Sequence, residues 1–193
     1  MAASRTAVLV CQGRAAADGL VVPDRFGDPV ARRLLHDDER EVVDRVRAGA
    51  VPDGWAARLD YESVKASAEL MVPRTVAIDD AVRERANPQL VILGAGLDGR
   101  AWRMPGPAVY EVDQPDSRRD KRSRASDLPG DPPTYVAVDF GRDRLGAALA
   151  AAGHDAAAPT TWVWEGVVPY LTKAQVEATA QEVAAGSARR AAG

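Results

Sequence analysis

The chain has 193 residues, enough for one sizeable hydrophobic core, and two full domains are not expected. Its 46% hydrophobic and 27% charged residues are typical of a globular protein, and its net charge of -3 gives no electrostatic case for binding nucleic acid or an anionic membrane. The only cysteine, Cys11, excludes an internal disulfide framework, and the two histidines, His36 and His154, leave too little material for a histidine-based metal site. The apolar run at residues 7–11 is too short for a secretory or transmembrane segment, so a cytoplasmic location is expected.

Residues 1–87 are predicted to form a helical lead-in without strands. Asp28, followed by proline, suits the start of a helix, because it can accept a hydrogen bond from a free backbone amide. Residues 37–50 place three valines on one apolar stripe, and residues 55–86 also follow a helical pattern. Pro73 is expected to break this last helix because it lacks a backbone donor.

From residue 88 the sequence pattern changes, and residues 88–193 form the second predicted unit. Short, nearly continuous apolar runs suit strands that are covered on both faces. Four such runs occur: QLVILG (89–94), AVYEV (108–112), TYVAVDF (134–140) and TTWVWEG (160–166). Helical or turn-forming stretches separate them, which predicts an α/β fold with a parallel sheet.

The first predicted strand runs into the turn GAGLDGR. Gly94, Gly96 and Gly99 satisfy the G-x-G-x-x-G pattern of a dinucleotide-binding turn, in which glycines let the backbone approach a phosphate closely. Asp98 lies inside this turn and would oppose a pyrophosphate, since a helix N-terminus there attracts negative charge. The turn therefore leaves two ligand classes open, a pyrophosphate and a cofactor with a cationic group.

The other strand ends also carry polar residues, and the carboxyl ends of parallel strands are where ligands bind. Asp113, after the second strand, can accept two hydrogen bonds from the hydroxyls of a ribose, which fits NAD and S-adenosylmethionine (SAM) equally. Asp139 and Phe140 follow the third strand and could flank an adenine ring. Glu165 and Tyr170 follow the fourth.

Taken in order, the motifs PRTVAIDD, LGAGLDGRAWRMP, VYEVDQP, VDF and WEGVVPYL resemble those of the SAM-dependent methyltransferases related to leucine carboxyl methyltransferase, especially its bacterial branch. The resemblance runs from the N-terminal helices to about residue 184. It implies a Rossmann-like methyltransferase fold with SAM as cofactor. Such folds have seven strands in the order 3-2-1-4-5-7-6, of which four are present.

The resemblance also implies roles for individual residues. Arg74 would pair with the carboxylate of SAM, a contact that suits a bidentate guanidinium. Glu165 would lie at the amino-acid end and the sulfonium, and Asp98 would add to a field that favours these cations. The full expected cofactor site comprises Arg74, Gly94, Gly96, Asp98, Asp113, Asp139, Phe140 and Glu165.

Simpler structural roles compete with some of these assignments. Asp139 could cap the next helix, and Asp98 could brace its own loop. The basic run SRRDKRSR is expected to be a solvated helix face and not a phosphate site. Tyr170 could line the substrate side but is expected in the core. Trp162 and Trp164 alternate along one strand and should share a face in the core.

The predicted function is O-methylation of a carboxylate or hydroxyl on a small molecule or peptide end. A carboxylate acceptor needs no general base, so no catalytic residue is named. Two alternatives remain open: an NAD(P)-binding oxidoreductase domain, and a non-catalytic truncated remnant. The sequence stops before strands five to seven, so the chain is expected to be truncated, with the fourth strand left at an edge where it could self-associate.

Overall fold

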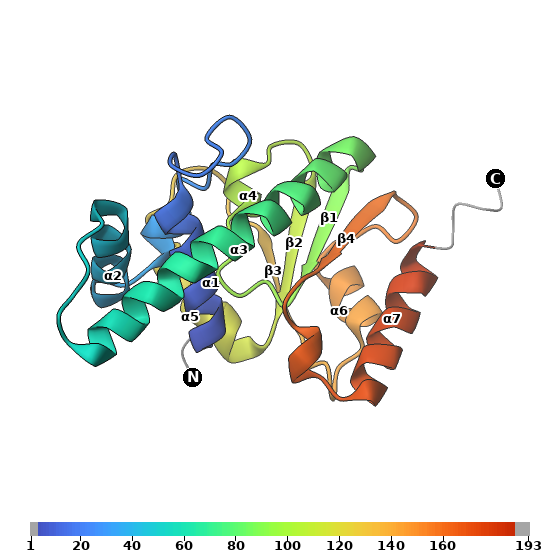
Figure 1. Ribbon diagram of the computed structural model, residues 1–193. Coiled ribbons are helices and arrows are strands. Elements are labelled where there is room, and N and C mark those ends of the chain that lie inside the picture. Colours follow the sequence, from blue (N-terminus) through green and yellow to red (C-terminus); the bar gives the residue numbers. More distant parts are fainter. Residues whose placement is uncertain (1–3, 188–193) are drawn as a thin grey trace.

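Four short parallel strands form the sheet at the centre of the protein, for which the computed structural model describes residues 4–187 (Figure 1). The strands are β1 (Gln89–Leu93), β2 (Ala108–Asp113), β3 (Thr134–Ala137) and β4 (Thr160–Trp164). Their order is β3-β2-β1-β4, with Val91 of β1 opposite Tyr110 of β2 and Trp162 of β4. The predicted α/β fold with a parallel sheet is confirmed, although β3 ends earlier than its apolar run suggests.

Helices precede the sheet and connect its strands. The α-helices are α1 (Arg5–Ala17), α2 (Asp37–Ala48), α3 (Trp55–Arg85), α4 (Arg100–Arg103), α5 (Pro115–Arg124), α6 (Leu145–Ala151) and α7 (Lys173–Ser187), and the 3-10 helices are η1 (Ala31–Leu34) and η2 (Val168–Tyr170). None of the helices within the described residues is long and apolar enough to cross a membrane. The end of the chain, residues 188–193, on which the expected truncation partly rests, lies outside the described residues. The boundary proposed at residue 87 stays a prediction.

Helix α3 is continuous, so the predicted break at Pro73 is wrong. Its 31 residues span about 46 Å at 1.5 Å per residue, and in Figure 1 it crosses in front of α1 and the sheet. Val72 and Val76, on either side of the proline, are buried against α1 and the following loop. This packing offsets the backbone hydrogen bond that Pro73 cannot make.

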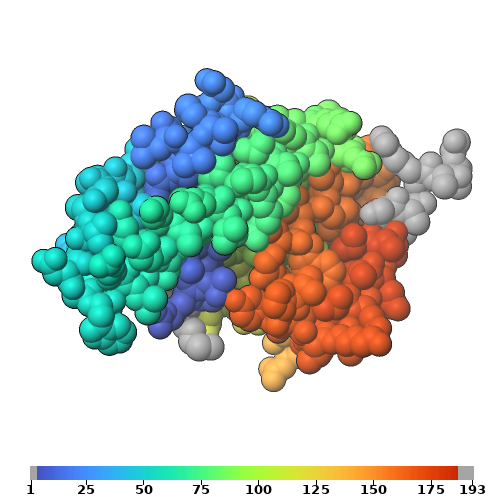
Figure 2. Space-filling model, in the orientation of Figure 1, coloured from blue at the N-terminus to red at the C-terminus, as the bar shows by residue number. Residues whose placement is uncertain are grey.

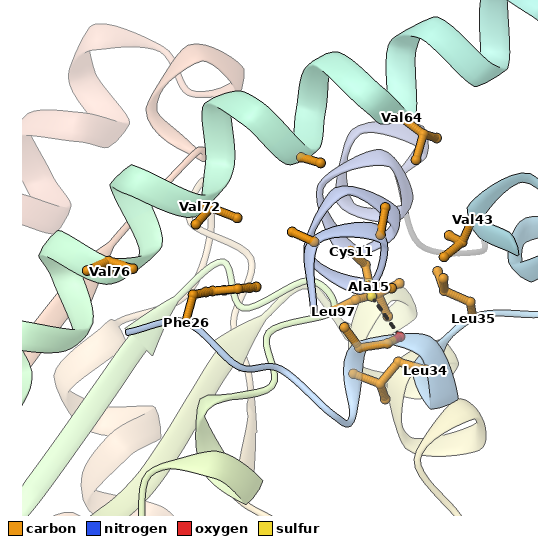
Figure 3. Close-up of a cluster of buried hydrophobic side chains, with 14 of the residues drawn as sticks. Cys11, Ala15, Phe26, Leu34, Leu35, Val43, Val64, Val72, Val76 and Leu97 are labelled. Carbon is orange, nitrogen blue, oxygen red and sulfur yellow. Dashed lines mark hydrogen bonds between the residues drawn. The ribbon is translucent and has the colours of Figure 1, made fainter. Parts of the chain in front are cut away.

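The helices before the sheet enclose their own apolar cluster, shown in Figure 3. Cys11 lies at its centre, fully buried, and its Sγ donates to the carbonyl of Ala31 at 3.2 Å. Burial raises the pKa of this thiol to about 12, so Cys11 acts as a small apolar residue. Asp28 is not the N-cap predicted for the next helix, because that segment is the 3-10 helix η1 with Val30 at its N-cap, but its Oδ1 accepts from the amide of Ala31 at 3.1 Å.

Alternate residues of the strands face two different layers of helix. Leu90 and Ile92 of β1 pack with Val82 of α3, whereas Val91 and Leu93 pack in the cluster that contains α6. That second cluster also holds the side chains of both tryptophans of β4, which confirms that they share a face. The sheet is thus covered on both sides, as its apolar strands predict.

Helix α5 is only in part the solvated face predicted for SRRDKRSR, because Arg119 and Arg122 are exposed but two other cations are buried. Lys121 is 2% exposed, and its Nζ lies 2.6 Å from Oε2 of Glu111 on β2. Burial raises the pKa of Glu111 from 4.5 to about 7, although the charge of Lys121 opposes this shift. Arg124 is also drawn inward, to Glu39 and Asp120. Buried carboxylates on neighbouring elements determine the orientation of these two cations, which the charge pattern of one helix does not reveal.

We expect Lys121→Met to destabilise the protein by about 3–5 kcal/mol at pH 8, because Glu111 would remain buried without its cation. The double variant Glu111→Gln/Lys121→Met should recover most of this loss. The folded form holds a proton on Glu111 more tightly than the unfolded chain, so this group lowers stability as pH rises from about 4.5 to 7. The cost of Lys121→Met should therefore be smaller at pH 5 than at pH 8. Urea unfolding measures both effects, and a double variant no more stable than Lys121→Met would contradict the explanation.

Candidate functional site

A cavity of about 330 Å³ opens at the carboxyl ends of β1, β2 and β4. Parallel sheets bind ligands at this edge. Seven of the eight residues predicted for the cofactor site line it: Arg74, Gly94, Gly96, Asp98, Asp113, Phe140 and Glu165. The fold therefore brings together residues that are up to 91 positions apart in the chain.

A larger cavity, of about 550 Å³, lies at the opposite end of the strands. Its lining includes Gln89 and Thr161, near the starts of β1 and β4, and three prolines of the adjoining loops. None of the predicted site residues lines it. We take the smaller cavity as the candidate site because the glycine turn and the strand-end acid both face it.

The glycine turn after β1 needs its glycines. Gly94 has φ 67° and donates its amide to the carbonyl of Val112 at 2.7 Å. Gly96 has φ 49°, and its amide donates to Oδ2 of Asp113 at 2.7 Å. Both glycines thus occupy the left-handed region that side chains disfavour, and the second ties the turn to the end of β2.

Asp113 is held by two backbone amides at the rim of the cavity. Gly96 donates to Oδ2 and Gln114 donates to Oδ1, each at 2.7 Å. Burial raises the pKa of Asp113, and the two amide bonds oppose that shift. Each carboxylate oxygen has a further lone pair, so a fixed acceptor pair remains for a ligand.

Asp98 braces its own loop. Its Oδ1 accepts from the amide of Arg100 at 2.7 Å, and its Oδ2 is ion-paired with the Arg100 guanidinium. Burial alone would raise the pKa of Asp98, but the charges of Arg100, Arg14 and Lys121 outweigh it and hold the pKa well below its usual range. The negative charge is therefore matched within the protein, and Asp98 no longer discriminates between a cationic and a phosphate ligand.

Glu165, just after β4, is shared between two arginines. Its Oε1 lies 2.6 Å from the Arg74 guanidinium, and its Oε2 lies 3.3 Å from that of Arg100. The Nε of Arg74 is buried and has no hydrogen-bond partner among residues 4–187. One cation and one anion, both with spare hydrogen-bonding capacity, therefore meet at this end of the cavity.

Asp139 is the one predicted residue that does not line the cavity. Its Oδ1 accepts from the amide of Gly141 at 2.9 Å, and its side chain is 40% exposed. This bond closes a local turn, and Asp139 does not cap the next helix, since the N-cap of α6 is Arg144. Phe140 does line the cavity, so the adenine-flanking role stays a prediction for both residues, with support from position for Phe140 alone.

No sequence motif predicted that residues of α1 line the cavity. Thr6 and Arg14 line the cavity together with other residues near the start of the chain. Tyr170 also lines it and is 64% exposed, so its predicted place in the core is wrong. Its hydroxyl lies 2.7 Å from Oγ1 of Thr6, and Figure 2 shows the start of α1 beside the segment that follows β4. The resemblance covers both segments, but only their contact in the fold reveals this wall.

Within the part of the chain that the structure describes, no group of three or more histidine, cysteine or acidic side chains is arranged to hold a metal ion. The features described above, a parallel sheet, a glycine turn after β1 and an acid at the end of β2, are those of a Rossmann-like protein that binds a cofactor containing a nucleoside.

Comparison with known proteins identifies the family. The profile described as leucine carboxyl methyltransferase matches residues 7–184, and the chain belongs to this family. A relative from Mycolicibacterium smegmatis is 36% identical over 184 residues, which cover 86% of this chain and 57% of the relative. A relative from Mycolicibacterium gilvum is 35% identical over 196 residues, covering 95% of this chain and 62% of the relative. Both are named S-adenosyl-L-methionine-dependent methyltransferases, and the chain spans about three fifths of their length.

We expect Gly94→Ala to destabilise the protein more than Gly49→Ala, because the two glycines share a similar φ but differ in surroundings. A Cβ at Gly94 would overlap Cγ2 of Val167, whereas a Cβ at Gly49 would meet nothing within 4 Å. The strained φ costs about 1–2 kcal/mol at either position, and crowding adds about 1–3 kcal/mol at Gly94. Urea unfolding of both variants measures the difference, and equal losses would show that Val167 yields without cost.

Proposed function

We propose that this chain is the cofactor-binding part of a SAM-dependent methyltransferase that methylates a carboxylate or hydroxyl oxygen on a small molecule or a peptide end. The observation that carries the proposal is that Arg74 and Asp113 line one cavity, on either side of the glycine turn. SAM joins an amino acid to a nucleoside, and this cavity offers a complementary group for each part.

The nucleoside half fits the end of β2. Asp113 is fixed by two backbone amides and keeps acceptor capacity for the two hydroxyls of a ribose. The glycines at 94 and 96 let the backbone turn sharply at the edge of the cavity, and Val167, which also lines the cavity, occupies the space that a Cβ on Gly94 would need. Phe140 supplies an aromatic ring in the same lining, which suits an adenine face.

The amino-acid half fits the pair formed by Arg74 and Glu165. An α-amino acid carries one carboxylate and one ammonium, and this pair presents one guanidinium and one carboxylate. The free Nε of Arg74 is a further donor for the ligand carboxylate. Glu165 also contacts Arg100, which keeps it in place when Arg74 turns to a ligand.

A dinucleotide would leave this pair without a partner. NAD fits Asp113 as well as SAM does, and the loop pairing of Asp98 removes the argument against a pyrophosphate. The names of the relatives and the charges of Arg74 and Glu165 favour SAM.

The residues of this chain would contribute to catalysis by positioning the cofactor and the acceptor. When bound, SAM provides an electrophilic methyl group on a sulfonium. Arg74, Asp113 and the glycine turn would orient it, and Tyr170 with Thr6 would form the wall beside the acceptor. A carboxylate acceptor is already ionised, so the residues need not remove a proton. Transfer of labelled methyl to an acceptor as a base-labile ester would support a carboxylate acceptor, and a base-stable labelled ether would indicate a hydroxyl acceptor that has lost its proton.

The edge position of β4 supports a further proposal on partners. Within residues 4–187, β4 pairs only with β1, so its other edge is open to a strand from a second copy or from another polypeptide. The acceptor of the methyl group is the other proposed partner.

We expect Asp113→Asn to weaken SAM binding at least tenfold, a loss of about 1.4 kcal/mol, because an amide replaces one of the two ribose acceptors with a donor. Asp131→Asn, at an exposed position away from the cavity, should bind SAM like the parent protein. Isothermal calorimetry with SAM measures the affinities. Unchanged binding by Asp113→Asn, or tighter binding of NADH than of SAM by the parent, would overturn the proposal.

We expect Arg74→Gln to weaken binding of S-adenosylhomocysteine about tenfold and to leave binding of 5′-methylthioadenosine unchanged. The second ligand lacks the amino-acid group that Arg74 would contact, so it controls for damage to the nucleoside site. Arg74→Lys should retain part of the affinity for S-adenosylhomocysteine, since it keeps the charge but loses the guanidinium fork. An equal loss for both ligands would assign Arg74 a structural role instead.

A further inference from the structure

The basic face of α5 has no part in the proposed cofactor site. Of its cations, Lys121 and Arg124 turn inward to buried or half-buried carboxylates. Arg122 is exposed and Arg118 is half-buried, and the two lie one helical turn apart on α5. We propose that these two arginines and the adjoining groove bind an acidic peptide segment of a partner protein.

Arg118 and Arg122 are available for a ligand. Among the described residues, no carboxylate lies within ion-pair distance of either. The Nε of Arg118 is buried and has no hydrogen-bond partner in the same range. The guanidinium of Arg122 lies over the ring of Tyr135, 5.7 Å from its centroid, which holds it in place and leaves its edge open to an acceptor.

The arginines border two adjoining cavities that share Arg122. The cavity on the α5 side is about 500 Å³ and is lined by Arg118, Arg119 and Arg122 with two further residues of the helix. The cavity beyond it is about 540 Å³ and presents both polar and apolar groups. Its other lining residues are Trp102, Ala125, Ser126, Leu128, Gly130, Pro132, Pro133 and Tyr135. A ligand that combines carboxylates with apolar side chains would match both parts.

The local charge is opposite to that of the whole chain. A third cavity, of about 390 Å³, shares Ser126 and Leu128 with the second, and together the three linings contain six arginines and two aspartates. Three of these arginines are ion-paired, as Arg119 is with Asp116, and once the acids that pair with them are included the positive surplus is small. The whole chain has a net charge of -3 and would repel a long polyanion. A short acidic segment that touches only the groove avoids this repulsion, so a peptide is favoured over nucleic acid.

The test measures binding of a fluorescein-labelled peptide of alternating glutamate and leucine to the full chain by fluorescence anisotropy. We expect the double variant Arg118→Gln/Arg122→Gln to weaken binding about tenfold or more, because each arginine would form a charge-assisted hydrogen bond. The matched control is Arg58→Gln/Arg85→Gln, which removes the same charge from exposed positions on α3 and should leave binding unchanged. Thermal unfolding of both variants checks that the fold is intact.

Two further ligands test whether the groove prefers an acidic peptide. The same peptide with glutamine in place of glutamate should bind at least tenfold more weakly, and so should a single-stranded oligothymidylate of equal length. No measurable binding of the acidic peptide, equal losses in the two double variants, or tighter binding of the oligothymidylate would overturn the proposal. None of these readouts depends on SAM, so the failure of this proposal would leave the methyltransferase proposal untouched.

Discussion

The arrangement of the site depends on the ion pairs that the guanidinium of Arg100 makes with three carboxylates. The Arg100 side chain is 2% exposed and reaches Asp79 on α3 at 2.8 Å, Asp98 in the glycine turn, and Glu165 after β4 at 3.3 Å. A buried cation is costly unless several acceptors surround it in fixed positions. The long helix, the turn and the end of β4 are therefore held at distances set by one side chain. Since Glu165 also contacts Arg74, this constraint extends into the cavity.

A second set of directional contacts ties the first helix to the same turn. Arg14 of α1 donates to Asp28 at 2.8 Å and to the carbonyl of Leu97 at 2.6 Å, and Arg103 is ion-paired with Asp79. Apolar packing alone would allow these helices to slide, because it has little directional preference. Buried hydrogen-bonded charges specify one position, and they allow α1 to form a wall of the cavity although it is remote from the sheet in sequence.

The sequence predicted the parts of this fold that depend on local patterns. Apolar runs located the four strands, and the rule that ligands bind at the carboxyl ends of parallel strands located the cavity. The predictions from the sequence were wrong where tertiary contacts determine the local structure. Pro73 does not interrupt α3 because buried valines on both sides keep the helix packed. Lys121 is buried because it forms an ion pair with the buried carboxylate of Glu111. For Asp98 the sequence left a ligand contact and a bracing role in its own loop both open, and only the ion pair with Arg100, two residues away, supports the bracing role. Pairings of this kind depend on side-chain direction, which spacing in the chain does not give.

The contact between Thr6 and Tyr170 joins residues 164 positions apart. During synthesis, the glycine turn and Asp113 leave the ribosome well before Tyr170 does, so the first half of the cavity can form while its last wall is still absent. Closing so long a loop costs entropy that only later contacts repay, which makes this wall a late event in folding. A ligand that needs both walls of the cavity therefore binds only to chains in which these two distant segments are already in contact.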